Sequence, residues 1–324
     1  METTNKRQLL PTRYSMEEVN PTMKVLVTGA SGLLGKKVIK ELLDKDYNVV
    51  ALYNRNQIPF NHDKLIKIQL DLSNKVYLED LILKKKPDII IHLAAYTNVD
   101  GCEINKDKAW SINVEATRSI VRAARVVKAH IIYISTDYVF DGEKGLYKET
   151  DTPNPINYYG LTKLIGEEII RSSDLLYTII RPSAIYGIGG SKKSFAEFVA
   201  EKLSRGEKIY ALIDQYVSPT LNTLLAKAIA EVVEMKPMGT LHIAGERKNR
   251  YEFAVKLAKA LDLPIDLIEK ASIKEMKKWV AKRPRDSSLD TTKARNILKT
   301  RFYDTKLAIE LFTQEWSSIS SNHR

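Results

Sequence analysis

The chain has 324 residues, of which 44% are hydrophobic and 28% are charged, as in ordinary globular proteins. This length accommodates one large domain, or a large and a small domain that share a cleft. Cys102 is the single cysteine, which excludes an intramolecular disulfide framework and a zinc site built from several cysteines. We therefore expect a reducing, cytoplasmic location, and no stretch approaches the ~20 apolar residues that a membrane-spanning helix needs.

The formal net charge of +11 raises the question of nucleic-acid binding. The sequence has no nucleic-acid motif and no basic stripe interleaved with aromatic residues, so we interpret the excess lysine as a solvated surface and expect no nucleic-acid partner. The five histidines lack metal-ligand spacing, so we predict no metal site. Residues 1–22 lack the apolar run of a signal peptide and are predicted to form a disordered extension before Met23.

Strand and helix signals alternate from Lys24 to about Ile180. Runs rich in Val and Ile predict strands at Lys24–Thr28, Asn48–Tyr53, Leu65–Leu70, Asp88–Leu93, His130–Ser135 and Leu175–Ile180. Helical periodicity lies between most of them, at Gly32–Asp46, Lys75–Lys85, Lys106–Lys128 and Tyr158–Ser173. Apolar strands alternating with helices indicate an α/β fold, with a Rossmann-type doubly wound parallel sheet over residues 23–180. Ligands of such sheets bind at the carboxyl edge of the strands.

After Pro182 helical segments dominate the pattern. They are predicted at Ser194–Ser204, Leu221–Val233, Tyr251–Leu261 and Thr305–Leu311. Short strands are predicted between them at Thr240–Ile243 and Ile265–Ile268. We assign residues 181–324 mainly to a smaller C-terminal lobe that closes over the carboxyl edge of the sheet and binds substrate.

A glycine-rich turn joins the first predicted strand to the first helix. Gly29 permits a tight turn, Gly32 lets the backbone approach a pyrophosphate, and Gly35 allows close packing of helix on strand. Free N–H groups at the helix start then face the phosphates. The spacing is GxxGxxG, so a simple βα turn is the alternative, but the position after a strand favours a dinucleotide. The predicted cofactor contacts are Gly29, Ser31, Gly32, Leu33, Leu34 and Gly35.

The end of the second strand bears on cofactor choice. It carries Asn54 and Arg55 rather than the Asp or Glu that binds the ribose of NAD, and Arg55 suits the 2′-phosphate of NADP. NADP is therefore favoured over NAD, although a solvated loop role for Arg55 is an equal alternative. Asp71 and Leu72 follow the third strand and are predicted to contact the adenine, with a capping role for Asp71 equally plausible.

The central catalytic candidates are Thr136, Tyr159 and Lys163. Tyr159 and Lys163 are four residues apart and share one face of a helix, whereas the rival Tyr158 lies five residues from Lys163. An adjacent ammonium is expected to lower the pKa of the Tyr159 phenol, which then protonates a carbonyl oxygen as hydride arrives from the nicotinamide. Lys163 is also expected to hold the nicotinamide ribose, and the Thr136 hydroxyl to polarise the same carbonyl.

These residues resemble the extended short-chain dehydrogenase/reductases, and specifically the dTDP-4-dehydrorhamnose reductase family. The resemblance runs from Met23 to about Trp316. It rests on VTGASGLLG at 27–35, HLAAYTNVD at 92–100, STDYVFDG at 135–142, YGLTK at 159–163, DQYVSPT at 214–220 and RPRDSSLD at 283–290. The third and last of these strings are far more specific than the glycine triplet.

The resemblance implies NAD(P)H-dependent reduction of the 4-keto group of a nucleotide-linked 6-deoxy sugar, and a homodimer is compatible with it. It implies further cofactor contacts from Leu93, Ala94, Ala95, Tyr96, Ser135, Tyr159, Lys163, Arg181 and Ser183. It implies substrate contacts from Thr97, Val99, Thr136, Asp137, Tyr138, Gln215, Arg283 and Ser288. Asn113 is either a supporting residue or a structural asparagine.

Two departures from the family pattern fall in the substrate pocket. Ala184 and Ile185 stand where the reductases usually carry an aromatic residue and Val, and Ser194 stands where an asparagine commonly precedes an aromatic residue. The identity of the sugar is therefore open, whereas the cofactor motif is intact.

Two other readings remain. The regulatory β subunit of methionine adenosyltransferase resembles the chain almost as well, and under that reading the protein keeps the NADP fold but serves as the partner of an adenosyltransferase catalytic subunit. A nucleotide-sugar dehydratase needs Asp then Glu after the threonine, whereas this chain has Asp137 then Tyr138. An epimerase is not excluded by that test, although the C-terminal strings argue against it.

Overall fold

The computed structural model describes residues 23–321, so the extension predicted at residues 1–22 lies outside the described residues. A seven-stranded sheet forms the centre of the molecule, in the order β11-β6-β5-β4-β1-β2-β3, and every neighbouring pair is parallel. Its strands are β1 (Lys24–Thr28), β2 (Asn48–Tyr53), β3 (Leu65–Gln69), β4 (Ile89–His92), β5 (His130–Ile134), β6 (Tyr177–Arg181) and β11 (Gly239–His242). The strand order reverses between β1 and β4, as in Rossmann sheets, which confirms the predicted fold class.

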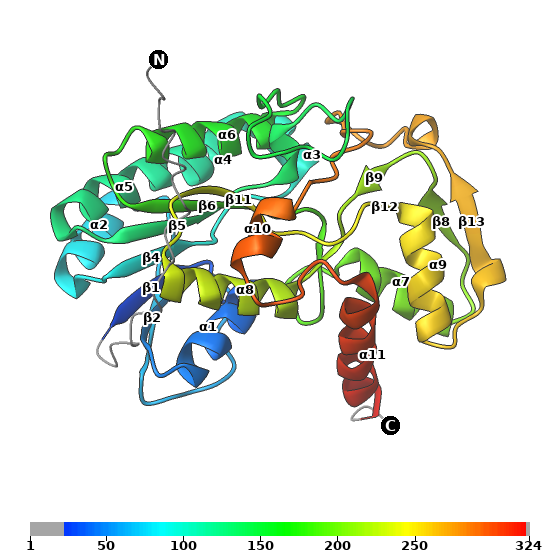
Figure 1. Ribbon diagram of the computed structural model, residues 1–324, viewed down its shortest axis with the longest axis horizontal. Helices are drawn as coiled ribbons and strands as arrows, with labels where there is room; N and C mark the ends of the chain where they lie inside the picture. The colour runs from blue at the N-terminus through cyan, green and yellow to red at the C-terminus, as the bar shows by residue number, and fades with distance from the viewer. Residues whose placement is uncertain (1–22, 322–324) are drawn as a thin grey trace, which may run out of the picture.

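Helices cover both faces of this sheet (Figure 1). One layer consists of α1 (Gly35–Asp44) and α8 (Asn222–Met235), and the other of α2 (Lys75–Lys85), α5 (Ala116–Val127) and α6 (Tyr158–Arg171). Successive residues of β1 point to opposite faces, so Val25 and Val27 join the core shared with α1, and Leu26 joins the core shared with α2 and α5. Because both faces are buried, these strands are apolar throughout rather than alternating.

The helix predicted over Lys106–Lys128 forms, but one of its turns is widened. It comprises α4 (Lys106–Trp110), a π-helical turn η1 (Ser111–Glu115) and α5. The Asn113 side chain accepts a hydrogen bond from Tyr96 N (2.7 Å) and donates one to Thr162 Oγ1 (3.0 Å). The π turn therefore places a buried amide between the loop that follows β4 and helix α6, a common use of such turns.

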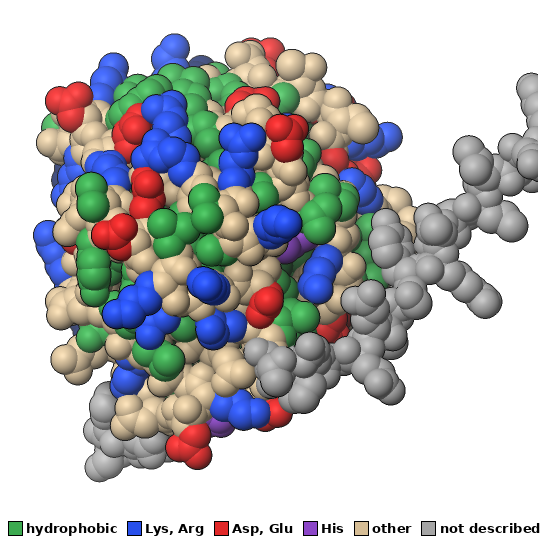
Figure 2. Space-filling model, turned by 90° about the vertical axis from the view of Figure 1, so that its left-hand side faces the viewer, with side chains coloured by type: hydrophobic (Ala, Val, Ile, Leu, Met, Phe, Trp, Pro, Cys, Tyr) green, Lys and Arg blue, Asp and Glu red, His purple; other side chains and the backbone are tan. Residues whose placement is uncertain are grey.

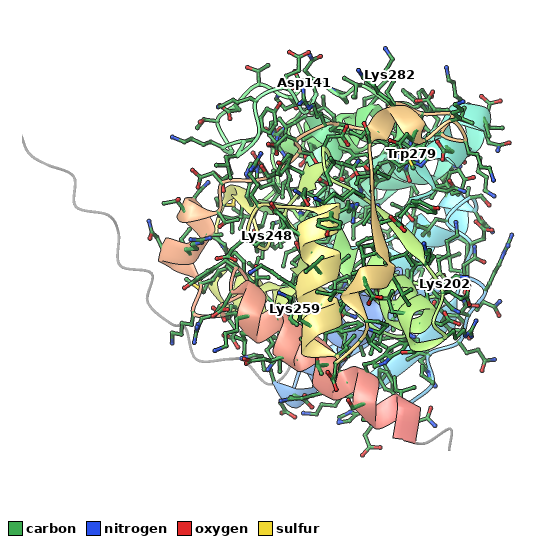
Figure 3. The ribbon with its side chains drawn as sticks, turned by 90° about the vertical axis from the view of Figure 1, so that its right-hand side faces the viewer. Asp141, Lys202, Lys248, Lys259, Trp279 and Lys282 are labelled. Carbon is green, nitrogen blue, oxygen red and sulfur yellow. The ribbon has the colours of Figure 1, made fainter. Side chains whose placement is uncertain are left out.

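The smaller lobe lies beside the carboxyl edge of the sheet, and Figure 3 looks onto it, with α9 and α11 in front. It contains α7 (Phe195–Ser204), β8 (Ile209–Leu212), α9 (Arg250–Ala260) and β13 (Ile268–Ala271). Strands β8 and β13 form a two-stranded parallel sheet of their own. The strand predicted at Ile265–Ile268 is wrong, because residues 265–267 form a 3₁₀ turn after Pro264 and pairing with β8 begins only at Ile268.

The strand predicted at Thr240–Ile243 does form, but in the large sheet rather than in the lobe. It is β11, which pairs with β6 at the edge of the sheet, and α8 packs with α1 on one face. The chain therefore returns to the Rossmann sheet after residue 181. The remaining elements are α3 (Val99–Ile104), η2 (Asp137–Val139), β7 (Ile185–Tyr186), β9 (Tyr216–Val217), β10 (Thr220–Leu221), β12 (Lys248–Asn249), η3 (Ile265–Leu267), η4 (Ile273–Glu275), α10 (Thr292–Ile297) and α11 (Thr305–Ser321).

Two observations concern the surface. Within residues 23–321, no helix is both long and apolar enough to cross a membrane. Figure 2 shows the side of the molecule that lies on the left in Figure 1, where basic side chains are interspersed with acidic and apolar ones rather than gathered in one patch.

Candidate active site

A cavity of about 970 Å³ runs along the carboxyl edge of the sheet, where the strand order reverses. Residues at the ends of β1, β2, β4 and β5 form one wall, and Val217 and Arg250 of the C-terminal part contribute to the other. This is where open α/β sheets bind their ligands, and the volume is at the upper end of the usual range for ligand pockets.

The glycine-rich turn forms the floor of one end of this cavity, as its sequence predicts. Gly29 has a φ of +67°, and a Cβ there would lie 2.8 Å from the backbone nitrogen of Ala94. A Cβ on Gly35 would overlap the carbonyl oxygen of Gly29. The cavity is lined by every residue predicted for this turn, namely Gly29, Ser31, Gly32, Leu33, Leu34 and Gly35. A backbone this open at the start of α1 fits the pyrophosphate of a dinucleotide.

The ends of β2 and β3 form the adjacent part of the cavity. Asn54, Arg55, Asp71 and Leu72 all line it. Asp71 accepts hydrogen bonds from Ser73 N (2.8 Å) and Asn54 Nδ2 (3.3 Å), and the bond from Ser73 holds the pKa of the Asp71 carboxyl below its usual value. Asp71 therefore closes a turn before α2 and binds Asn54, but the predicted capping alternative is wrong, because the N-cap of α2 is Asn74, which accepts from Tyr77 N. Arg55 is exposed at this end.

Thr136, Tyr159 and Lys163 meet on the wall of the same cavity. Thr136 follows β5, whereas Tyr159 and Lys163 occupy successive turns of α6, whose start is fixed by Asn157 Oδ1 accepting from Gly160 N (2.8 Å). The rival Tyr158 does not line the cavity, and its ring lies 5.3 Å from Lys106 Nζ. The structure thus brings Thr136 together with two side chains that lie 23 and 27 residues later in the sequence.

Burial controls the protonation of this group. Lys163 is 1% exposed, and burial lowers its pKa to about 7, opposed by the charge of Glu167. Burial, followed by the charge of Asp137, raises the pKa of Tyr159 well above its ordinary value, while a hydrogen bond with Thr136 opposes the shift. The predicted lowering of the Tyr159 pKa is therefore wrong, because Lys163 is itself desolvated and its Nζ lies over the Tyr133 ring at 3.9 Å. Tyr159 keeps its proton at neutral pH.

Asp137 is a buried anchor beside this group. Its carboxylate accepts hydrogen bonds from Thr136 Oγ1 (3.1 Å), Ser183 Oγ (2.8 Å) and Ser287 Oγ (2.6 Å). Burial raises the pKa of Asp137, and the three hydroxyl groups oppose that rise. The carboxylate thus ties the end of β5 to two segments of the C-terminal part and orients the Thr136 hydroxyl.

Most of the remaining predicted contacts lie on the cavity wall, but five do not. Those on the wall are Leu93, Ala94, Ala95, Tyr96, Thr97, Val99, Ser135, Asp137 and Tyr138. Those away from the wall are Arg181, Ser183, Gln215, Arg283 and Ser288. Their predicted contacts with cofactor or substrate stay predictions.

Each of these five has another partner in the structure. Arg181 is 1% exposed and binds the Glu167 carboxylate through two nitrogens (2.9 and 2.6 Å). Arg283 binds Asp100 of α3 (3.1 and 2.9 Å). Ser183 binds Asp137, Ser288 binds Asp286 (2.6 Å), and Gln215 accepts from Arg250. These five side chains therefore bind other residues of the protein and do not line the cavity.

Sequence reasoning missed several cavity residues. Lys108, Lys192, Lys193 and Arg250 line the wall without having been predicted, and the departures Ala184, Ile185 and Ser194 line it as well. The lysines belong to no motif. Arg250 has one local signal, since Asn249 and Glu252 form a capping box that marks the start of α9 immediately beside it.

Comparison with known proteins agrees with this geometry. The RmlD substrate binding domain profile matches residues 23–317. A solved structure of a hypothetical dTDP-4-dehydrorhamnose reductase from Sulfolobus tokodaii is 46% identical, with a TM-score of 0.79, and covers 88% of this chain and 98% of that one. The dTDP-4-dehydrorhamnose reductase from Bacillus anthracis, solved in complex with NADP, is 29% identical, with a TM-score of 0.80, and covers 91% and 99%.

A subunit of an adenosyltransferase is similar as well. Methionine adenosyltransferase 2 subunit beta of Bos taurus is 33% identical over 291 residues, which are 87% of this chain and 84% of the relative. The resemblance inferred from the sequence is confirmed, together with the relationship to the adenosyltransferase subunit. The chain therefore belongs to the RmlD substrate-binding-domain family of extended short-chain dehydrogenase/reductases.

Proposed function

We propose that this protein reduces the 4-keto group of a nucleotide-linked 6-deoxy sugar with NADPH. The observation that carries the proposal is the convergence of Thr136, Tyr159 and Lys163 on one wall of the cavity that the glycine-rich turn opens at its other end. The solved reductase from Bacillus anthracis, which binds NADP and matches 91% of the chain, supports the same chemistry. The neutral phenol of Tyr159 also supports it, because reduction of a carbonyl needs a proton donor.

Different residues bind the two ends of the cofactor. Backbone N–H groups of Ser31, Leu33 and Leu34 would hold the pyrophosphate at the start of α1, and Arg55 would meet the 2′-phosphate at the end of β2. Lys163 holds the nicotinamide ribose. When bound, the nicotinamide supplies the hydride that reduces the keto carbon.

Tyr159 and Thr136 act on the carbonyl oxygen of the substrate. Tyr159 donates its phenolic proton to the carbonyl oxygen as negative charge develops there. The Thr136 hydroxyl accepts from Tyr138 N (3.2 Å) and donates to Asp137 (3.1 Å), so its single proton must leave Asp137 before it can polarise the substrate carbonyl. Asp137 and the substrate thus compete for the same donor.

The test is turnover of a dTDP-4-keto-6-deoxy sugar, followed by the loss of NADPH absorbance. The wild type is expected to consume NADPH, and Tyr159→Phe, which removes the donated proton and little else, is expected to lower kcat by about 10²-fold or more. Tyr158→Phe is the matched control, because Tyr158 lies outside the cavity wall, and it is expected to retain activity. Absence of turnover in a wild type that binds NADPH would refute the reductase assignment.

The second candidate is a regulatory subunit of a methionine adenosyltransferase. The observation that favours it is the 33% identity with the Bos taurus subunit over most of both chains. Under this function the protein binds NADP and an adenosyltransferase catalytic subunit without turning over a sugar. Copurification of a catalytic subunit with the tagged protein from its native cells, together with absence of sugar turnover, would decide for it.

A further inference from the structure

Arg250 is the first residue of α9, and its place on the cavity wall is rigidly fixed. The preceding Asn249 accepts from Glu252 N (2.7 Å), and Glu252 accepts in return from Asn249 N (3.3 Å), which completes a capping box. The backbone N–H of Arg250 donates to Gln215 O (3.3 Å). In Figure 3 the neighbouring Lys248 marks this end of α9 and Lys259 marks the opposite end.

The guanidinium group of Arg250 has few partners within the protein. Its Nε donates to Gln215 Oε1 at 3.3 Å, and the group lies 5.2 Å from the centre of the Phe195 ring. Among residues 23–321 it forms no ion pair, unlike Arg181, whose two nitrogens bind Glu167. The terminal NH1 and NH2 groups, with four N–H donors, have no acceptor among the described residues.

This arrangement leaves the charge of Arg250 without an opposite charge paired to it within the described residues. A guanidinium stays charged in proteins, and the half-buried Arg250 faces the cavity without an ion-pair partner among residues 23–321. Burial is the largest effect on the pKa of Arg250 and lowers it, whereas the nearby Tyr138 and Asp137 raise it only in part. An unpaired, half-buried cation on a cavity wall is therefore suited to a ligand that brings the missing negative charge.

The position of Arg250 indicates which ligand it meets. Tyr138 and Asp137, the two groups whose charges act on it, directly follow Thr136, and the Tyr138 ring lies 6.1 Å from the Tyr159 ring. Arg250 therefore borders the part of the cavity where the reacting sugar must lie. The planar fork of a guanidinium matches two oxygens of one phosphate or carboxylate.

We propose that Arg250 binds an anionic oxygen pair of the nucleotide-sugar substrate and so determines which sugars enter. The inference rests on the proposed function, because it assumes a nucleotide-linked sugar in this cavity. Two parts of a nucleotide sugar carry this chemistry: the diphosphate, which the proposed 6-deoxy sugar has, and a carboxylate on the hexose, which a 6-deoxy sugar lacks at C6. Binding experiments distinguish them, and a carboxylate contact would change the sugar assigned to the cavity.

The experiment is isothermal titration calorimetry on the full chain saturated with NADP. The ligands are UDP, UDP-glucose and UDP-glucuronic acid, with dTDP and dTDP-glucose in parallel to cover the choice of base. Arg250→Gln keeps the bond to Gln215 but removes the charge, and Arg250→Lys keeps the charge but removes the fork. Arg295→Gln is the control, because Arg295 stacks on Tyr303 (4.1 Å) and does not line the cavity.

Weaker binding of every nucleotide to Arg250→Gln, by about tenfold or more, assigns Arg250 to the diphosphate, with Arg250→Lys intermediate. Weaker binding of UDP-glucuronic acid alone assigns it to a carboxylate on the sugar. Wild-type affinity of Arg250→Gln for every ligand would overturn the inference and leave the proposed reductase intact. A wild type that binds none of the ligands would overturn both, and unchanged NADP affinity shows that the variants fold.

Discussion

The charge of Lys163 is sensitive to pH near neutrality. Its pKa is lowered to about 7 because the ammonium is removed from water, and Glu167 opposes this shift only in part. The ammonium is present below the pKa and is lost as the pH rises through it. The neutral phenol of Tyr159 persists throughout this range, because burial raises its pKa. We therefore expect the loss of activity at alkaline pH to follow deprotonation of Lys163 rather than of Tyr159.

We predict that kcat/KM for the reduction falls as the pH rises above about 7, by up to about tenfold per pH unit. Lys163→Arg keeps a positive charge over this range. We expect this variant to be less active than the wild type, but its kcat/KM should not fall as the pH rises. The measurement is NADPH consumption from about pH 6 to about pH 9, with Lys106→Arg, which lies outside the cavity wall, as control. A wild-type profile that stays flat up to about pH 9 would contradict the assignment.

At this scale the sequence predicts local motifs better than long-range contacts. Tyr159 and Lys163 are predictable because four residues of helix place them on one face, and Gly29 is predictable because a strand precedes it. Arg250 reaches the same cavity from more than 80 residues beyond Lys163, and the capping box beside it predicts the start of α9 but not its place on the cavity wall. The pKa of Tyr159 is mispredicted because proximity to Lys163 can be read from spacing whereas burial cannot.

Among the elements, the π turn η1 connects the cofactor side of the cavity to the catalytic helix. Asn113 in this turn donates to Thr162 Oγ1, and Thr162 Oγ1 donates to the carbonyl oxygen of Tyr159 (2.8 Å). On its other side, Asn113 O accepts from Thr117 Oγ1 (2.7 Å), so His92 Nε2 must be the donor to Thr117. The His92 ring stays neutral in this chain, since burial lowers its pKa to about 3.

We predict that Asn113→Ala lowers the free energy of unfolding by about 1–3 kcal/mol, because Tyr96 N loses its buried acceptor. It should also lower kcat more than it raises KM, since the start of α6 loses a bond that positions Tyr159. Urea unfolding and steady-state kinetics measure the two effects. The control is Asn61→Ala, at an exposed loop position. Unchanged kcat in a destabilised Asn113→Ala would show that the amide is structural only.

The periodicity of the sequence predicts which elements exist but not which elements pair. Strands β1, β2, β4 and β5 are found close to their predicted ends, since buried strands are marked by continuous apolar runs. β11 is predicted as a strand but not as a member of the large sheet, because its partner β6 lies about 60 residues earlier. The π turn could not be predicted from the sequence either, because one widened turn barely changes the spacing of apolar residues along a long helix.

At the scale of the whole molecule, the candidate active-site cavity lies between a sheet edge built by the first half of the chain and a lobe built mainly by the second. Both parts line it, from Gly29 at the end of β1 to Arg250 at the start of α9. Asp137 and Arg283 connect the two parts, because each binds a residue of the other part: Asp137 binds Ser287, and Arg283 binds Asp100. A ligand that fills the cavity therefore stabilises the whole fold and not one part of it.

We therefore predict that NADPH raises the melting temperature more than NADH does at equal concentration. At 100 times its Kd a ligand adds about 2.7 kcal/mol to the free energy of unfolding, and Arg55 gives NADPH the lower Kd through the 2′-phosphate. Arg55→Ala should weaken NADPH binding by about tenfold and leave NADH unchanged, whereas Arg118→Ala, on α5 outside the cavity wall, should change neither. Equal stabilisation of the wild type by the two cofactors would show that the exposed Arg55 is a solvated loop residue, and the absence of a carboxylate after β2 would then confer no preference for NADP.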